Sequence, residues 1–132
     1  MTSENVAVAQ RVAAALSRGD YGAAATDLDA DVEWHNTAAF PGPRRYSGPE
    51  GVRAFLNDQT ESFDLQGMEI ERVAEASDQV VLVVHSWGQG KASAVPVDAR
   101  FAMIFTLHDA KVVRIEVRGH HAEVLEAMGR RE

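Results

Sequence analysis

Four side chains on two predicted strands could carry out chemistry on a carbonyl compound. Trp34 and Asn36 stand two residues apart in the stretch VEWHN, so in a strand they share a face while His35 faces away. His85 and Trp87 have the same spacing after the apolar run VVLVV. An imidazole titrates near neutral pH, and a carboxamide and indole N–H groups can donate to a developing oxyanion. The pattern predicts acid–base chemistry that needs no cofactor, with His85 and Asn36 as the catalytic residues.

Each of these residues also has a purely structural explanation. His85 could be a hydrogen-bonded interior histidine, and Asn36 could satisfy the backbone of the loop that follows it. Apolar and aromatic residues at strand spacing, such as Phe101 and Met103, most often belong to a core. Sequence alone leaves these alternatives open.

Other chemistries find less support. The five histidines show neither H-x-H nor H-x-x-x-H spacing, so no metal site is predicted. There is no G-x-S-x-G motif, and Ser86 is expected to face away from His85. The chain has no cysteine for a thiol nucleophile or a disulfide. Arg44 and Arg45 could clamp an anionic substrate, although a solvated loop pair explains them better.

Composition limits the kinds of partner. A chain of 132 residues with 45% hydrophobic and 25% charged residues is expected to form one domain over residues 1–132. A net charge of -7 argues against nucleic acid and anionic membranes and favours a small neutral or cationic ligand. The first sixteen residues, MTSENVAVAQRVAAAL, lack the basic start of a signal peptide and the length of a membrane span. A cytoplasmic location is expected.

The elements that must position these residues follow from caps and periodicity. Ser3 and Asp20 can each cap a helix, Gly19 can end the first one, and Gly48 with Pro49 can begin the third. Helices are therefore predicted at 4–18, 20–28, 48–63 and 121–128. Strands are predicted at 31–36, 65–75, 79–90, 95–108 and 111–119, with an irregular loop before the third helix. Helices followed by consecutive strands predict an α+β domain in which a curved antiparallel sheet wraps around the helices.

Alternation within the strands predicts one ligand-binding face. If Phe101 and Met103 face the helices, their charged neighbours face outward. The residues expected to contact a substrate are Trp34, Trp87, Phe101, Met103, Val117 and Phe55. A wall of this composition suits a small apolar or aromatic ligand. The strand at 79–90 is apolar on both faces, so Val80, Leu82, Val84 and Ile104 are expected to form an outer patch that a homodimer covers.

The order of elements resembles a known family. Helix, short helix, strand, the loop with SGPEGVRAF and a meander closing in HDAKVVRIEVRGHHAEVLEAMG resemble the SnoaL-like and ketosteroid-isomerase-like branch of the nuclear transport factor 2-like fold. The resemblance covers the whole chain and implies a cone-shaped α+β fold. Proteins of this fold include isomerases, cyclases, dehydratases, epoxide hydrolases and binding modules without catalysis.

The catalytic residues of two relatives are mostly replaced here. The positions of the tyrosine, base aspartate and protonated aspartate of the steroid isomerases correspond to Val12, Asn36 and Met103. Of the residues that act in limonene-type epoxide hydrolases, only the asparagine is kept, at Asn36. The resemblance to the family as a whole implies a polyketide cyclase or isomerase type of enzyme that acts on an apolar, carbonyl-containing or polycyclic substrate. The alternatives are a non-catalytic ligand-binding or dimerisation module and an epoxide-hydrolase-like enzyme.

Overall fold

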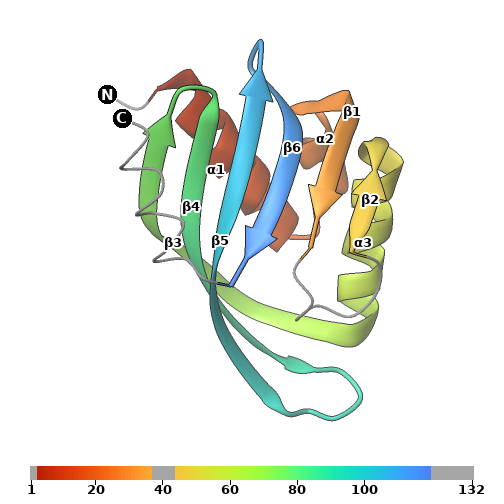
Figure 1. The fold of residues 1–132 in the computed structure, drawn as a ribbon. Helices are drawn as coiled ribbons and strands as arrows, with labels where there is room; N and C mark the ends of the chain where they lie inside the picture. The colour runs from red at the N-terminus through yellow and green to blue at the C-terminus, as the bar shows by residue number, and fades with distance from the viewer. Residues whose placement is uncertain (1–2, 37–43, 120–132) are drawn as a thin grey trace.

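The computed structural model describes residues 3–36 and 44–119, and these form three helices and one sheet (Figure 1). The helices are α1 (Glu4–Ser17), α2 (Tyr21–Ala25) and α3 (Gly48–Ser62). The strands are β1 (Leu28–His35), β2 (Arg45–Ser47), β3 (Phe63–Ala76), β4 (Gln79–Gly90), β5 (Pro96–His108) and β6 (Lys111–Arg118). None of the described helices has the length and apolar character that a membrane span requires.

Local signals set the ends of the first two helices. The Ser3 hydroxyl accepts from the Val6 N–H at 3.1 Å, and the Asp20 carboxylate accepts from the Ala23 N–H at 3.1 Å. Gly19 has a φ of +72°, a conformation that favours glycine over other residues. The N-caps and the turn after α1 are therefore as predicted, although α2 is shorter than expected because β1 begins at Leu28.

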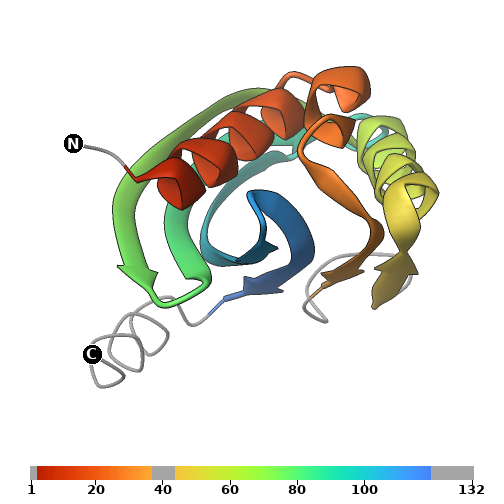
Figure 2. The ribbon, with the colours of Figure 1, turned by 90° about the horizontal axis from the view of Figure 1, so that it is seen from above.

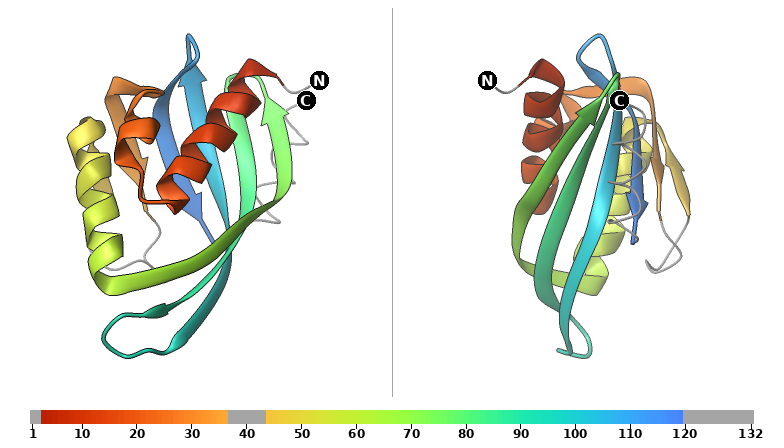
Figure 3. Two further views of the ribbon diagram at one scale, coloured as in Figure 1. Left: turned by 180° about the vertical axis from the view of Figure 1, so that it is seen from behind. Right: turned by 60° about the vertical axis from the view of Figure 1, so that its left-hand side comes forward.

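The six strands form one curved sheet in the order β2-β1-β6-β5-β4-β3. The sheet curls around α1, which lies across its inner face (Figure 2). α3 lies beside β1 and β2, away from α1 (Figure 3). The hairpin of β4 and β5 extends beyond the rest of the sheet (Figure 1). The α+β class and the curved sheet around N-terminal helices are confirmed.

Two details of the sheet differ from the expectation. β1 pairs with β6 in parallel, so the sheet is mixed rather than antiparallel. The segment read as an irregular loop contains β2, a three-residue strand that pairs with β1. The parallel pairing joins β1 to β6, which is far along the chain, so no turn between the two strands could indicate it. The helix expected at 121–128 lies outside the described residues.

The main core lies between the inner face of the sheet and the helices. Val12 of α1 and Val52 of α3 are fully buried in it with Leu82 of β4 and Phe105 of β5. A separate, smaller cluster on the outer face consists of Ala76, Val81, Ala102 and Ile104 with Ala74 packed against it. The sheet therefore has two apolar faces of unequal size.

The outer apolar patch expected from the sequence is not present as described there. Val80, Leu82 and Val84 are 0% exposed and belong to the inner core, and Ile104 is only 9% exposed. The expectation of an exposed outer patch is wrong for Val80, Leu82 and Val84, because they face the helices, whereas Ile104 lies on the outer face as expected, in the small cluster. A homodimer stays a prediction without the patch that motivated it.

Candidate functional site

Three aromatic rings from β1, β2 and α3 pack together at one end of the inner face. Trp34 is 2% exposed and stacks on Phe55 with 4.2 Å between ring centroids and 28° between planes. Tyr46 meets Phe55 edge-on at 5.6 Å and 72°. Both rings of β1 and β2 point inward because Trp34 and Tyr46 are partners in the antiparallel register. The cluster fixes the Trp34 indole against the helix layer.

Asn36 presents a hydrogen-bond donor beside this cluster. The Trp34 Nε1–H donates to Asn36 Oδ1 at 2.6 Å. An indole nitrogen can only donate, so the amide atom that it contacts must be the oxygen. Asn36 Nδ2 is then the other end of the amide, and it is buried without a hydrogen-bond partner in the described part of the chain. A buried donor of this kind is rare and calls for an explanation.

The Tyr46 hydroxyl is held by a carboxylate of α3. It donates to Asp58 Oδ2 at 2.9 Å. Burial of the phenol, and secondarily this hydrogen bond, raise the pKa of Tyr46 to about 12. Tyr46 is therefore a neutral phenol at physiological pH that anchors β2 to α3.

Apolar side chains of β5 and β6 continue the inner face. Met103 and Val117 are partners in the register and are buried in the main core, and Phe101 packs against that core while half-buried. Trp34 pairs with Ile115 on the neighbouring β6, so alternation places Asn36 on the side of Val117. Trp34, Phe55, Phe101, Met103 and Val117 thus lie on the inner face with Asn36, as expected.

The expected placement of His85 and Trp87 on the inner face is wrong. In the β4–β5 register His85 pairs with Arg100, and Val84 pairs with Phe101. Cross-strand partners share a face, so His85 lies with the charged face of β5 and Val84 lies with the core. A one-residue difference in register moves every side chain of a strand to the other face. The imidazole and the Asn36 amide therefore belong to opposite faces of the sheet.

On the outer face His85 joins a network of charges across three strands. Its Nε2 lies 3.0 Å from both carboxylate oxygens of Asp98, and its Nδ1 lies 3.3 Å from Glu69 Oε1. Hydrogen bonding to Asp98, and then to Glu69, raises the pKa of His85. The Arg100 Nε donates to Glu71 Oε1 at 3.0 Å. The arrangement stabilises an imidazolium between β3 and β5.

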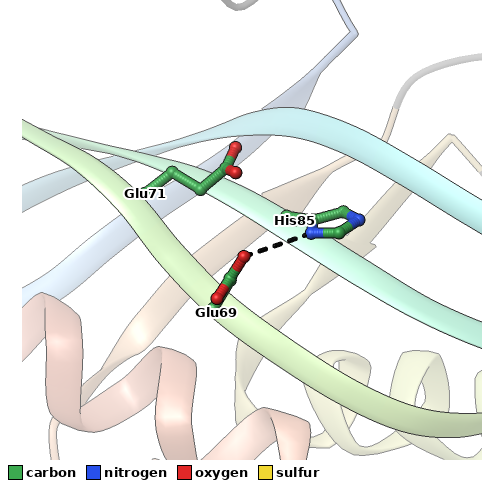
Figure 4. Close-up of side chains that lie close together, drawn as sticks. All are labelled: Glu69, Glu71 and His85. Atoms are coloured by element: carbon green, nitrogen blue, oxygen red, sulfur yellow. Dashed lines mark hydrogen bonds and ion pairs between the residues drawn. The ribbon is translucent and has the colours of Figure 1, made fainter.

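The same network contains the one group of potential metal ligands found among the described residues. Ligand atoms of Glu69, Glu71 and His85 lie within 4.8 Å of one another (Figure 4). Each of the three already has a partner in the network, and the Arg100 guanidinium sits at Glu71. A cation at this point would have to displace those ion pairs.

His35 also lies on the outer face, as the alternation in VEWHN predicted. Its Nε2 lies 2.9 Å from Glu33 Oε1, and Arg45 Nη2 donates to Glu33 Oε2 at 2.8 Å. These two contacts, with His35 the larger, lower the pKa of Glu33. His35 thus belongs to a group of polar contacts on β1 and β2, on the opposite face of the sheet from the aromatic rings.

Sequence reasoning missed Tyr46 and Asp58. Tyr46 fell in the stretch read as an irregular loop, yet Arg45-Tyr46-Ser47 alternates polar, aromatic and polar, which is typical of a short half-buried strand. Asp58 is an exposed helix residue, and its contact with Tyr46 spans twelve positions. No local signal identifies such a pair.

Comparison with known proteins identifies the family. The chain belongs to the SnoaL-like domain family, whose model matches residues 9–115. A nuclear transport factor 2-like protein of Burkholderia thailandensis has 23% identity and a TM-score of 0.79, with 97% of this chain and 98% of that chain covered. Comparison with curated proteins finds no match.

Two further solved structures share the fold. A Mesorhizobium loti protein described as a candidate SnoaL-like polyketide cyclase has 21% identity and a TM-score of 0.68, covering 83% of this chain and 94% of its own. TerC, co-crystallised with polyporic acid, has 20% identity and a TM-score of 0.74, covering 96% of this chain and 99% of its own. At these identities the likeness establishes the fold.

Proposed function

We propose that the inner face binds a small, apolar, carbonyl-containing or polycyclic molecule, and that Asn36 Nδ2 donates a hydrogen bond to its carbonyl oxygen. The activity is of the cofactor-free polyketide cyclase or isomerase type. The observation that carries the proposal is the buried Asn36 Nδ2, which has no hydrogen-bond partner among the described residues and lies beside the Trp34 ring.

The energetics of a buried amide favour such a ligand. Leaving a buried donor unsatisfied costs about 1–3 kcal/mol, and a ligand oxygen at Nδ2 would recover that cost. The apolar side chains around it would bury the carbon frame of the ligand. Since an enolate carries more charge on its oxygen than a ketone does, the same donor stabilises the transition state of enolisation more than the ground state.

The proton transfer is not assigned to His85, because its imidazole lies on the outer face. This point favours the second candidate function, a binding module of the same fold that holds the carbonyl compound without turning it over. The SnoaL-like membership and the small molecule in the TerC structure support a ligand in either case. Exchange of α-protons of a bound ketone with solvent deuterium distinguishes an enzyme from a binding module.

Binding of aryl ketones tests the proposal directly. A panel of monocyclic, bicyclic and tricyclic ketones with ¹³C-labelled carbonyls is titrated into the protein and followed by NMR. The carbonyl signal of a bound ketone is expected to move downfield, as it does when the oxygen accepts a hydrogen bond. Asn36→Ala should abolish that shift and weaken binding about 5- to 160-fold, which corresponds to the roughly 1–3 kcal/mol that the ligand recovers at Nδ2.

Asn57→Ala is the matched control, because Asn57 is an exposed asparagine on α3. It should leave both the carbonyl shift and the affinity unchanged. The proposal is overturned if no ketone of the panel binds, or if Asn36→Ala and Asn57→Ala bind the ketone equally well.

A further inference from the structure

The two ends of the Asn36 amide are not interchangeable in this site. A side-chain amide has nearly the same shape after a half-turn about its last torsion, which exchanges an acceptor with a donor. The Trp34 indole N–H at 2.6 Å breaks this symmetry, because a turned amide would place its NH₂ group against another donor. Turning the amide breaks the Trp34–Asn36 hydrogen bond and leaves the buried indole N–H without an acceptor. These two costs lower the population of the turned amide by a factor on the order of 10 to 100.

The indole itself has little freedom to follow such a turn. Trp34 belongs to β1, which pairs with β2 on one side and β6 on the other. Its ring is stacked on Phe55 with 4.2 Å between ring centroids. Phe55 is held in turn by the edge of Tyr46, and the Tyr46 hydroxyl is tied to Asp58 at 2.9 Å. The donor that orients Asn36 is thus fixed by packing from two strands and a helix.

We propose that Trp34 is a positioning residue that determines specificity: by fixing the Asn36 amide with Nδ2 toward the ligand, it restricts the site to molecules that present a hydrogen-bond acceptor. Ketones, quinones and other carbonyl compounds meet this condition. A molecule of the same shape with only an N–H donor leaves two donors facing each other. This inference rests on the proposed function, and it adds which group of the ligand must face Asn36 and which residue imposes that choice.

The proposal is tested with pairs of ligands that share a fused-ring frame but carry a hydrogen-bond acceptor in one member and a donor in the other. Fluorenone offers only an acceptor and carbazole only a donor at the corresponding position, and 1-indanone with indole is the bicyclic equivalent. The pair is chosen by the size of the ketone that binds best. The wild type should bind the ketone at least 10-fold more tightly than the N–H analogue.

Trp34→Phe removes the indole N–H but keeps a ring to pack against Phe55. Asn36 can then present either end of its amide, so the ratio of ketone to N–H affinity should fall to within about 3-fold of unity. A cavity left by the smaller ring changes both affinities in the same direction, because the two ligands have the same fused-ring frame. Trp87→Phe makes the same substitution on the outer face and should keep the wild-type ratio.

A measurement on the wild-type protein tests the same inference without any variant, so it applies even if Trp34→Phe does not fold. In ¹H–¹⁵N spectra the ketone should shift the Asn36 NH₂ signals and leave the Trp34 indole N–H signal in place, because the Trp34–Asn36 hydrogen bond persists. The inference is overturned if the ketone displaces the Trp34 N–H signal instead, or if Trp34→Phe keeps the wild-type ratio. A protein that binds no ketone, or whose Asn36→Ala variant binds the ketone normally, refutes the proposed function as well.

Discussion

Replacing Tyr46 with phenylalanine should change how the stability of the protein depends on alkaline pH. Tyr46 is 7% exposed and donates its hydroxyl proton to Asp58 at 2.9 Å. Burial and this hydrogen bond raise the pKa of Tyr46 to about 12. An unfolded tyrosine has a pKa of about 10, so the fold favours the protonated phenol.

The size of the effect follows from this difference in pKa. The stabilisation of the protonated phenol is fully present below about pH 10 and is lost as the pH rises from there through 12. Two pH units correspond to about 2.7 kcal/mol in total, of which about half, ~1.4 kcal/mol, is lost at pH 11. Both figures are upper values, because Asp58 is exposed and solvent screens its interaction with Tyr46.

Urea unfolding followed by circular dichroism at pH 8, 9.5 and 11 measures this loss. The free energy of unfolding of the wild type should approach that of Tyr46→Phe as the pH rises, by up to about 1.4 kcal/mol at pH 11. Tyr21→Phe removes the other of the two tyrosines and should follow the wild type. In that variant the absorbance at 295 nm reports Tyr46 alone and should titrate well above pH 10. Parallel stability curves for wild type and Tyr46→Phe, or titration near pH 10 in the folded protein, would refute the reasoning.

Three further substitutions probe the sheet. Gly67→Ala would place a methyl group inside the Trp87 ring, so it should destabilise the protein by about 1–3 kcal/mol and change tryptophan fluorescence; unaltered fluorescence and stability would contradict that contact. The raised pKa of His85 predicts a stability contribution that is present below about pH 6.5 and lost as the pH rises through the folded pKa. His85→Gln should therefore lower the urea midpoint more at pH 5.5 than at pH 8.5, and an equal loss at both would argue against the ion pairs. Phe105→Ala, in the core at 0% exposure, should cost about 3–5 kcal/mol, and a loss below 1 kcal/mol by urea unfolding would contradict its burial.

Local sequence was sufficient to place the starts of α1, α2 and α3 and the four long strands β3, β4, β5 and β6. Ser3 and Asp20 cap α1 and α2 because a capping side chain needs only the N–H groups of the next turn. Alternation correctly separated Trp34 from His35, since the pleat of a strand is a property of the strand alone. The order of these elements was enough for the α+β class and the family.

The tertiary structure decided which faces meet. The run VVLVV is apolar on both sides, so either phase of β4 buries valines and leucine, and the sequence of the strand does not distinguish them. The pairing of β4 with β5 makes the choice, because it sets His85 opposite Arg100 on the outer face and Val84 opposite Phe101 on the inner face. The contact of Tyr46 with Asp58 and the parallel pairing of β1 with β6 likewise join segments distant in sequence. Such contacts depend on how whole elements pack against one another, so the residues of a single element do not predict them.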